Sequence, residues 1–575
     1  MSQSNFNIIN AAAGSGKTYT LVLYYLKQLL GAKKPRPYRQ MLALTFTNKA
    51  VNEMKVRILK ALHDLSKTPS QNIELQEQLS QDLEIRIGEL TRRAETMLRN
   101  IVLEYGSFDV ITLDKFTHRI VRTFAKEFEL PKGFEVVLDS KSILDQVVQS
   151  IIDQIGKDEL ITQLLLELSL SKIRQGMSWD IQNDLDDFAA LLLNENDRIP
   201  LADLRKKDRQ THKKDQEQLK NSLKQTKERI KNKTSEFTQL LREKDLVPED
   251  FTRQILFKHL DLLHLEFYEK LYGNQLEAML KGLVPLYKKS TEASKKQMID
   301  QLLPQFLSLF LSIKKEVGFY LLIEKTLKYW TPRLILQQIE QGLKVLQNER
   351  EIRLLGEFNQ KISSLVQVEE APYIYARLGE RYNHYYLDEF QDTSSLQWSN
   401  LLPLIGSALE SESLSGEQGS LILVGDPKQA IYRWRGGDIM QFIQLLKKKS
   451  KPFQIVPLIK RLEVNYRSDA AIVSFNNIFF SYLTTVLVSP EIQSIYGEES
   501  QQQVKNPGGF VQIKAIPQGG NQEDKIPLYV AETISAIKQA MEHQFEQKEI
   551  AVLVRVKKQS VVISENLIAQ GYDIL

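Results

Sequence analysis

The segment AAAGSGKT (11–18) carries residue types suited to holding a phosphate. It lies between the apolar run FNIIN and the helical pattern TYTLVLYYLKQLL. Glycines at 14 and 16 allow a tight turn whose backbone N–H groups face an anion, and the following helix presents its N-terminus to the same anion. Lys17 can reach the β- and γ-phosphates, and Thr18 offers a hydroxyl to Mg²⁺. The expected nucleotide-binding residues here are Ala13, Gly14, Ser15, Gly16, Lys17 and Thr18.

A second candidate is YYLDEFQDT (385–393), an apolar strand pattern that ends in two carboxylates. Placing carboxylates at a buried strand end is costly unless they bind or react. Asp388 fits a magnesium ligand, and Glu389 could orient and deprotonate a water that attacks the γ-phosphate. The alternatives are a glycine-rich turn and a pair of acidic turn residues. Both are disfavoured because the two segments occur together, so we predict ATP hydrolysis with Mg²⁺.

These segments need strands to position them, and short apolar runs of suitable composition recur along the chain. They indicate buried parallel strands in a βαβ arrangement, hence an α/β fold. The runs are FNIINA, MLALTF, FDVITL, HYYLDEF, SLILVGD, IVPLIKRLEVNY, GFVQIKAI and EIAVLVRV. Residues 131–370 instead show helical apolar spacing, for example in KSILDQVVQSIIDQI and FLSLFLSIKKEVGFYLLIEKTL.

Composition excludes several classes of protein. The 575 residues contain no cysteine, which rules out disulfides and zinc–thiolate sites within this chain. No run of about 18 apolar residues and no secretory signal is present, so we expect a cytoplasmic protein with no membrane partner. The net charge of +4 is too small to indicate a nucleic-acid partner by itself.

Five long motifs occur in the order found in superfamily 1A DNA helicases. They are AAAGSGKT, LTFTNKAVNEMKVRI, YLDEFQDT, LVGDPKQAIYRWRGGD and LEVNYRS, which resemble motifs I, Ia, II, III and IV. The family often has alanine at the position of Ala11. The nearer resemblance is to the RecB/AddA branch, because ITLDKFTHRIVRTFAKEF (111–128) is similar to that branch's motif Ib. Asp114 stands where most members carry histidine.

The resemblance implies roles for further residues. Gln429 resembles the γ-phosphate sensor, Tyr466 the adenine-stacking residue, and Arg467 an arginine finger that reaches the γ-phosphate from the second motor domain. The implied single-stranded DNA contacts are Phe46, Asn48, Thr112, Tyr432, Trp434 and Arg435. Packing of Phe46, Tyr432 or Trp434 in a core is the alternative for the aromatics, and a surface Tyr–Arg pair is the alternative for Tyr466 and Arg467.

The resemblance also implies a domain organisation of RecA-like motor domains with an inserted, all-helical 1B domain. The expected limits are 1–130 and 371–452 for motor domain 1A, 131–370 for 1B and 453–575 for part of motor domain 2A. The 1B region is enlarged, as in the branch that uses it to dock a partner subunit. Its basic stretch near 205–245 predicts either a solvated helical hairpin or a contact with DNA or a partner.

The expected function is an ATP-dependent DNA helicase or translocase of 3′→5′ polarity, acting on single-stranded DNA or duplex ends in repair or recombination. No stretch resembles motif V or VI, so we expect the sequence to be part of a longer polypeptide. Two alternatives remain. One is an ATP-binding, DNA-binding scaffold subunit of a helicase–nuclease complex, and the other is a phosphate-loop ATPase that does not act on DNA.

Overall fold

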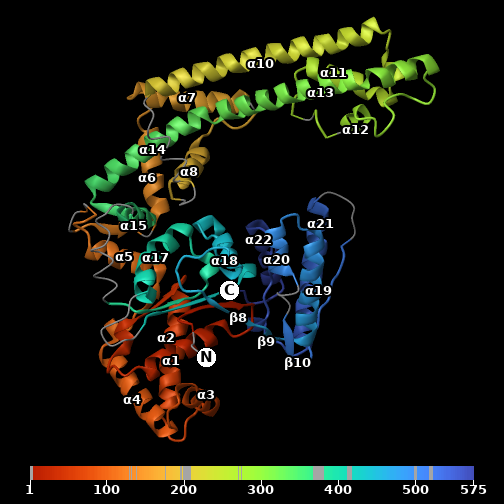
Figure 1. Cartoon of the computed structure of the whole chain (residues 1–575). Coiled ribbons are helices and arrows are strands. Elements are labelled where there is room, and N and C mark those ends of the chain that lie inside the picture. Colours follow the sequence, from red (N-terminus) through yellow and green to blue (C-terminus); the bar gives the residue numbers. More distant parts are fainter. Residues whose placement is uncertain are drawn as a thin grey trace. The chain divides into compact units, whose positions relative to one another are not determined.

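The computed structural model of the chain forms two compact units, residues 1–463 and 464–575 (Figure 1). It describes residues 4–574 except 129, 131–132, 138, 175, 194–196, 198–208, 270, 274, 367–380, 411–417, 498–501 and 517–521. Within these residues no helix combines the length and apolarity needed to cross a membrane.

The first unit is built on a six-stranded parallel sheet in the order β3-β2-β6-β7-β1-β8. The α/β class expected from the apolar runs is therefore confirmed. β6 and β7, which come late in the sequence, lie between β2 and β1. The strands are β1 (Phe6–Ala11), β2 (Met41–Thr45), β3 (Val110–Thr112), β6 (His384–Leu387), β7 (Ser420–Gly425) and β8 (Leu458–Leu462).

Alternate residues of each strand enter two separate cores, one on each face of the sheet. In β7, Leu421 and Leu423 face one core, whereas Ile422 and Val424 face the other. The core that contains Ile422 and Val424 is closed by α1 (Lys17–Gly31), α2 (Asn48–Leu65), α3 (Ile73–Leu83) and α4 (Ile87–Leu103). The core that contains Leu421 and Leu423 is closed by α5 (Leu113–Thr123), α15 (Phe358–Val366), α17 (Ser395–Glu410) and α18 (Ile439–Leu446). Burial on both faces explains why the strands read as continuous apolar runs.

The region between α5 and α15 is helical, but it is not entirely so. A short parallel pair, β4 (Glu135–Val137) and β5 (Ile352–Leu354), joins its two ends. The 1B region was expected to be all-helical, and this pair is the exception. The boundary expected at 370/371 falls outside the described residues. The helices are α6 (Ser140–Ile152), α7 (Glu159–Arg174), α8 (Gln182–Ala190), α10 (Arg209–Glu243), α11 (Ile255–His264), α12 (Leu276–Leu280), α13 (Ala293–Lys328) and α14 (Trp330–Glu349).

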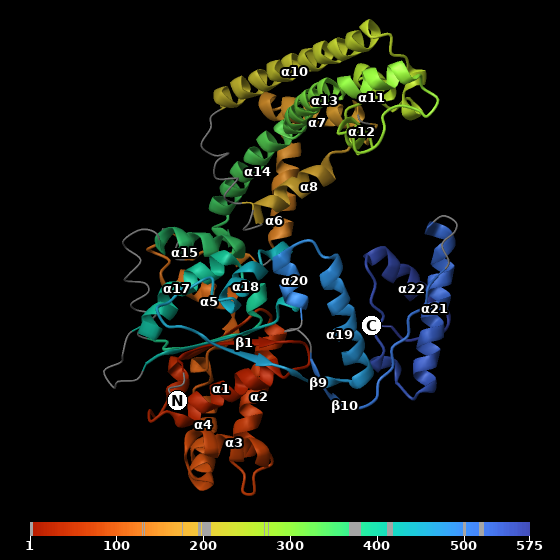
Figure 2. The same cartoon turned by 45° about the vertical axis from the view of Figure 1, so that its right-hand side comes forward.

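Within the basic stretch near 205–245, residues 209–243 form one long helix, α10, which lies antiparallel to α13 in a helical arm (Figure 2). Its buried positions recur every three or four residues at Thr226, Ile230, Thr234, Phe237 and Leu241. That spacing makes a single stripe that packs on α13, as in paired helices generally. Two basic side chains of α10 are used within this pair, since Arg229 and Lys233 both contact Glu316 of α13, at 2.9 and 3.1 Å.

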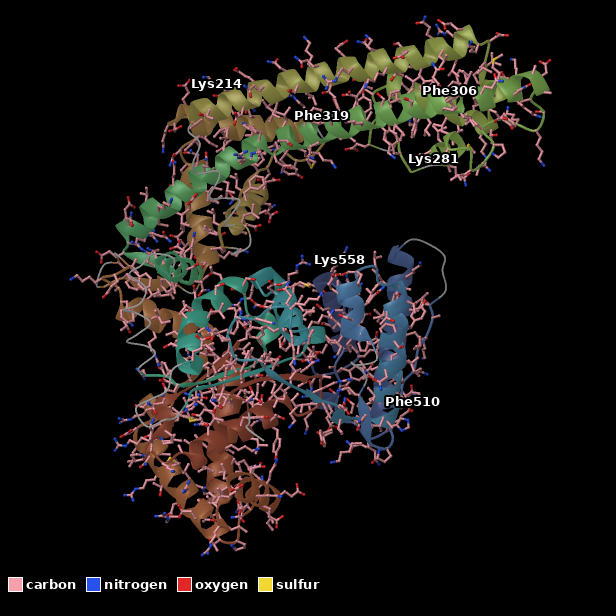
Figure 3. The ribbon with its side chains drawn as sticks, in the orientation of Figure 1. Lys214, Lys281, Phe306, Phe319, Phe510 and Lys558 are labelled. Carbon is pink, nitrogen blue, oxygen red and sulfur yellow. The ribbon has the colours of Figure 1, made fainter. Side chains whose placement is uncertain are left out.

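The exposure of two aromatic residues of α13 shows which face of this helix is packed. Phe306 of α13 is fully buried, with its ring centroid 5.3 Å from that of Phe237, whereas Phe319 is 46% exposed. Figure 3 marks both residues on α13. Phe319 follows buried Val317 by two residues, so it lies on a different face of α13 from the packed stripe.

The second unit contains one parallel pair, β9 (Val464–Asp469) and β10 (Gln503–Asn506). The prediction that GFVQIKAI and EIAVLVRV form strands differs from the structure, in which neither is assigned to a strand. Both segments lack a paired neighbour among the described residues and remain exposed, with Phe510 at 70% and Leu553 at 95%. The helices are α19 (Ala470–Val486), α20 (Pro490–Tyr496), α21 (Gln522–Glu542) and α22 (Lys557–Ala569).

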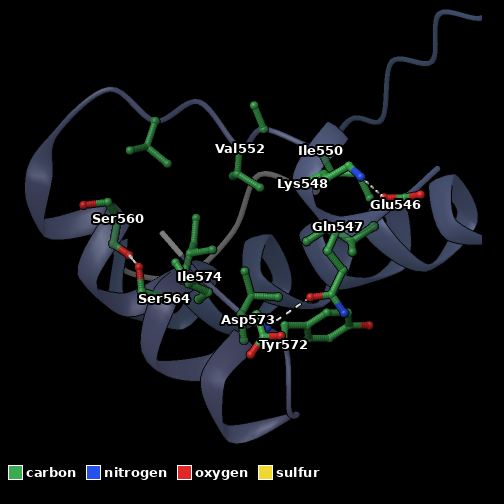
Figure 4. Close-up of a pocket in the computed structure, with 15 residues that line it drawn as sticks. Glu546, Gln547, Lys548, Ile550, Val552, Ser560, Ser564, Tyr572, Asp573 and Ile574 are labelled. Carbon is green, nitrogen blue, oxygen red and sulfur yellow. Dashed lines mark hydrogen bonds and ion pairs between the residues drawn. The ribbon is translucent and has the colours of Figure 1, made fainter.

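A pocket of the second unit lies against α22 and residues 546–554 (Figure 4). Aliphatic side chains dominate its lining, for example Ile537, Ile550, Ile563 and Leu567. Its polar groups are used locally, since the backbone N–H of Asp573 donates to Gln547 Oε1 at 3.1 Å and Lys548 pairs with Glu546. Nothing in this pocket matches the chemistry expected at the phosphate loop.

Candidate active site and nucleic-acid interface

The expected catalytic residues of the first unit follow three neighbouring strands. β6, β7 and β1 are adjacent and parallel, so their carboxyl ends meet at one edge of the sheet. The phosphate loop follows β1, Asp388 follows β6, and Asp426 follows β7. An open parallel sheet commonly binds its ligands at this edge. The late insertion of β6 and β7 beside β1 therefore brings together motifs that are far apart in the sequence.

The phosphate loop has the backbone that its glycines predict. Gly14 and Gly16 have φ of 76° and 87°, a region that side-chain-bearing residues rarely adopt. Ser15 is buried, and its hydroxyl donates to the Ala12 carbonyl at 2.7 Å. Helix α1 begins at Lys17 with no side-chain cap, so its first N–H groups remain available to an anion.

The Lys17 ammonium lies at the centre of the site. It donates to both Glu389 carboxylate oxygens, at 3.2 and 3.1 Å, and to Gln429 Oε1 at 3.0 Å. Its side chain is only 11% exposed. Lys17, from the loop after β1, therefore contacts directly one predicted residue after β6 and one after β7.

Asp388 is a buried carboxylate at the end of β6, 7% exposed. Burial raises its pKa to about 7, and the neighbouring Glu389 charge adds to this, while Lys17 opposes it. A carboxylate in this setting is stabilised by a nearby cation. Asp388 and the half-buried Thr18 hydroxyl are both oxygen donors suited to Mg²⁺, so the donor set fits the expected ion.

Glu389 adopts a left-handed backbone with φ 50° and ψ 46°. Residues other than glycine adopt this conformation in a small fraction of cases. The chain leaves the buried strand β6 at this point, and the Glu389 carboxylate contacts Lys17.

Two buried polar residues of the site were not predicted from the sequence. Asp426, fully buried, accepts from Gln429 Nε2 at 2.7 Å and from the Lys428 backbone N–H at 3.0 Å. Gln391, 1% exposed, donates to Glu389 Oε2 at 2.7 Å. Both lie inside quoted motifs. A polar residue directly after a buried strand is a signal for Asp426, whereas Gln391 lies four residues beyond the end of β6 and carries no such signal.

The residues predicted to contact DNA gather partly into one cluster. The rings of Phe46 and Tyr432 lie with centroids 4.5 Å apart, and the Arg435 guanidinium lies 5.0 Å from the Phe46 centroid. Arg435 also approaches Asp114 at 3.7 Å. Both rings are partly buried, and their contact with DNA stays a prediction.

The other expected contacts of the first unit have different surroundings. Asn48 is exposed at the start of α2. Thr112 is 6% exposed, and its hydroxyl caps α5 by accepting the Lys115 N–H at 3.2 Å. The side chain of Trp434 lies outside the described residues.

Tyr466 and Arg467 lie in β9 of the second unit. Tyr466 is 54% exposed, and the Lys505 ammonium lies 4.6 Å from its ring centroid. Asn465 accepts the backbone N–H groups of Arg467 and Ser468, both at 2.9 Å, and so fixes the local backbone. The Arg467 side chain is exposed. Its role at the phosphate site stays a prediction.

Several curated relatives resemble this chain at low identity, some of them over most of its length. RecBCD enzyme subunit RecB of Buchnera aphidicola is 24% identical over 83% of this chain and 38% of its own length. An ATP-dependent helicase/nuclease subunit of Clostridium novyi is 23% identical over 96% of this chain and 44% of its own. DNA helicase II of Haemophilus influenzae is 30% identical over 35% of this chain and 23% of its own. The chain thus spans less than half the length of these relatives.

Two family profiles divide the chain between them. Residues 2–450 match the UvrD/REP helicase N-terminal domain, and residues 460–574 match the UvrD-like helicase C-terminal domain. The profiles cover the phosphate loop, the acidic end of β6, the Gln429 loop and the β9 motif, so the resemblance seen in the motifs is confirmed. The chain belongs to the UvrD-like helicase family.

Proposed function

We propose that this chain is the ATP-hydrolysing motor of a DNA helicase. The observation that carries the proposal is the direct contact of Lys17 with Glu389 and Gln429 at three adjacent strand ends. Lys17 would bind the β- and γ-phosphates, together with the loop N–H groups of Gly14 to Thr18. Glu389 would then take a proton from the attacking water, and Gln429 would report the presence of the γ-phosphate.

Mg²⁺ would be held by Thr18 and Asp388, and when bound it neutralises charge that develops on the phosphate oxygens. Tyr466 would stack on adenine, and Arg467 would stabilise the γ-phosphate charge in the transition state. We propose both roles by family resemblance. The organisation into motor domains 1A and 2A with an inserted 1B domain is proposed on the same basis.

Single-stranded DNA is the proposed track of this motor. The Phe46, Tyr432 and Arg435 cluster combines aromatic faces with a cation, which suits stacked bases and a phosphate backbone. Tyr432 follows Gln429 by one short loop, so a change at the phosphate sensor can reach the aromatic cluster directly. Asn48, Thr112 and Trp434 are proposed as further contacts.

The finer assignments rest on the family alone. We propose 3′→5′ movement, a role in repair or recombination, and a helicase–nuclease partner that docks on the 1B region. A cytoplasmic location likewise stays a prediction. The competing proposal is a scaffold subunit that binds ATP and DNA without unwinding.

ATP hydrolysis with and without single-stranded DNA separates the two proposals. The motor predicts hydrolysis that DNA stimulates at least tenfold and that Lys17→Ala abolishes. ATP binding without stimulated hydrolysis would favour the scaffold and remove the catalytic roles assigned to Glu389 and Gln429.

A further inference from the structure

Gln391 lies on the single turn after Glu389 and is almost fully buried, yet it is not expected to touch nucleotide. Its amide joins two elements. Nε2 donates to Glu389 Oε2 at 2.7 Å, and Oε1 accepts the Asp426 backbone N–H at 3.0 Å. A buried amide is stable only when its donors and acceptors are satisfied, so this orientation of the side chain is strongly favoured.

These bonds close a ring of five residues. Lys17 donates to Glu389 and to Gln429, Gln429 donates to Asp426, and Gln391 connects Asp426 back to Glu389. The ring includes the phosphate-binding lysine, the proposed base and the proposed sensor. Gln391 and Asp426, both buried, complete the ring.

The backbone around Gln391 is adapted to this arrangement. Gly425, at the end of β7, faces the amide so closely that an added Cβ would lie 2.7 Å from Gln391 Oε1 and 2.9 Å from Phe442 Cε1. The absence of a side chain at 425 therefore leaves the space that the Gln391 amide occupies. Any larger residue there would displace Gln391 or Phe442.

We propose that Gln391 is a positioning residue that orients the Glu389 carboxylate for catalysis, an inference that rests on the proposed ATPase function. When Lys17 engages phosphate it is drawn away from Glu389, and the Gln391 amide then remains as the fixed donor to Oε2. Oε1 is left to accept a proton from water as the water oxygen bonds to the γ-phosphorus and the bond to the β–γ bridging oxygen breaks. The products are ADP and phosphate.

The same ring links the base to the sensor. Gln391 accepts the backbone N–H of Asp426, and the Asp426 carboxylate accepts from Gln429. A rotation of the Gln429 amide would therefore shift Gln391, which holds Glu389. Since Gln391 is not expected to touch the nucleotide, we expect it to affect hydrolysis and not nucleotide affinity.

The test is a double-mutant cycle on the full chain with saturating single-stranded DNA. Gln391→Met keeps the volume of the side chain but removes both hydrogen bonds. We expect kcat to fall about tenfold to a hundredfold, as for other residues that orient a catalytic group, with the KM for ATP changed less than threefold. In a Glu389→Gln background, Gln391→Met should change single-turnover hydrolysis less than twofold, since its target is already lost.

Gln397→Met is the matched control, because Gln397 is a buried glutamine of the same region whose Oε1 accepts the Ser394 N–H at 3.0 Å. Its kcat and KM should stay within twofold of wild type. If Gln391→Met does not fold, Gln391→Leu enters the same cycle, since its apolar side chain likewise makes neither hydrogen bond.

Equal effects of the Gln391 substitution in both backgrounds, or parallel losses in kcat and affinity, would overturn the positioning role. If Glu389→Gln itself leaves kcat unchanged, the proposed function fails instead, so the two failures are distinct.

Discussion

We expect the buried His259 to make the stability of the helical arm depend on pH. It lies in α11, is 3% exposed, and packs against Tyr272 and Phe310 with ring centroids 5.3 and 5.2 Å away. Burial lowers its pKa from 6.5 to about 4, and the backbone of Leu271 partly opposes this shift. The folded arm therefore holds a neutral imidazole where the unfolded chain would bind a proton.

The sign follows from linkage. Above pH 6.5 the imidazole is neutral in both states and the arm has its full stability. As the pH falls from 6.5 towards 4, the unfolded state binds a proton that the folded state does not, so stability is lost. The two pKa values correspond to a loss of about 2 kcal/mol by pH 5, approaching about 3 kcal/mol at pH 4.

Hydrogen exchange on the full chain can measure this loss. The free energy of opening, corrected for intrinsic exchange, would be followed in peptides from α11 and α13 between pH 7.5 and 5. His259→Leu should abolish the pH slope in these peptides, whereas His264→Leu, at an exposed position of the same helix, should leave it unchanged. An unchanged slope in His259→Leu would refute the assignment of the proton to His259.

Three further changes test separate parts of the structure. Asp109 is 1% exposed and accepts hydrogen bonds from Arg119, Arg381 and Tyr382 at 2.6, 2.8 and 2.6 Å. Because Asp109→Ala leaves these donors without their buried acceptor, it should lower the free energy of unfolding, measured in urea, by about 3 kcal/mol. A loss below about 1 kcal/mol would contradict this expectation. Phe46→Ala should weaken single-stranded DNA binding, measured by fluorescence anisotropy, by about tenfold with ATP affinity unchanged, because one stacking platform is lost. Gly16→Ala would find open space for its Cβ but not a favourable φ, so nucleotide affinity should fall about fivefold, a cost of about 1 kcal/mol; unchanged affinity would show that the φ of 87° is not needed.

Much of the fold of the first unit could be predicted from local pattern. The phosphate loop, the acidic end of β6 and the central strands each carry their own residue signature, and a buried parallel strand reads as an unbroken apolar run. The same rule led to two wrong strands in the second unit. GFVQIKAI and EIAVLVRV have strand composition, but a strand also requires a hydrogen-bonded neighbour, which sequence spacing does not reveal.

The contacts within the site were harder to predict than its members. Lys17, Glu389 and Gln429 were each predicted from their motifs, whereas Gln391 and Asp426 became visible only once the strand order placed β6, β7 and β1 side by side. Similarly, the basic composition of α10 did not reveal that Arg229 and Lys233 pair with Glu316 across the arm. Long-range pairing depends on topology, which local composition does not determine.

Binding of Mg–ATP to the full chain tests the central claim most directly, because every proposed step depends on phosphates reaching Lys17. Titration of wild type and Lys17→Ala by isothermal calorimetry would give both affinities under one set of conditions. The account predicts that Lys17→Ala binds at least tenfold more weakly, since the ammonium that would leave Glu389 for the phosphates is gone. Equal affinities would contradict the assignment of the loop at residues 11–18 as the nucleotide site.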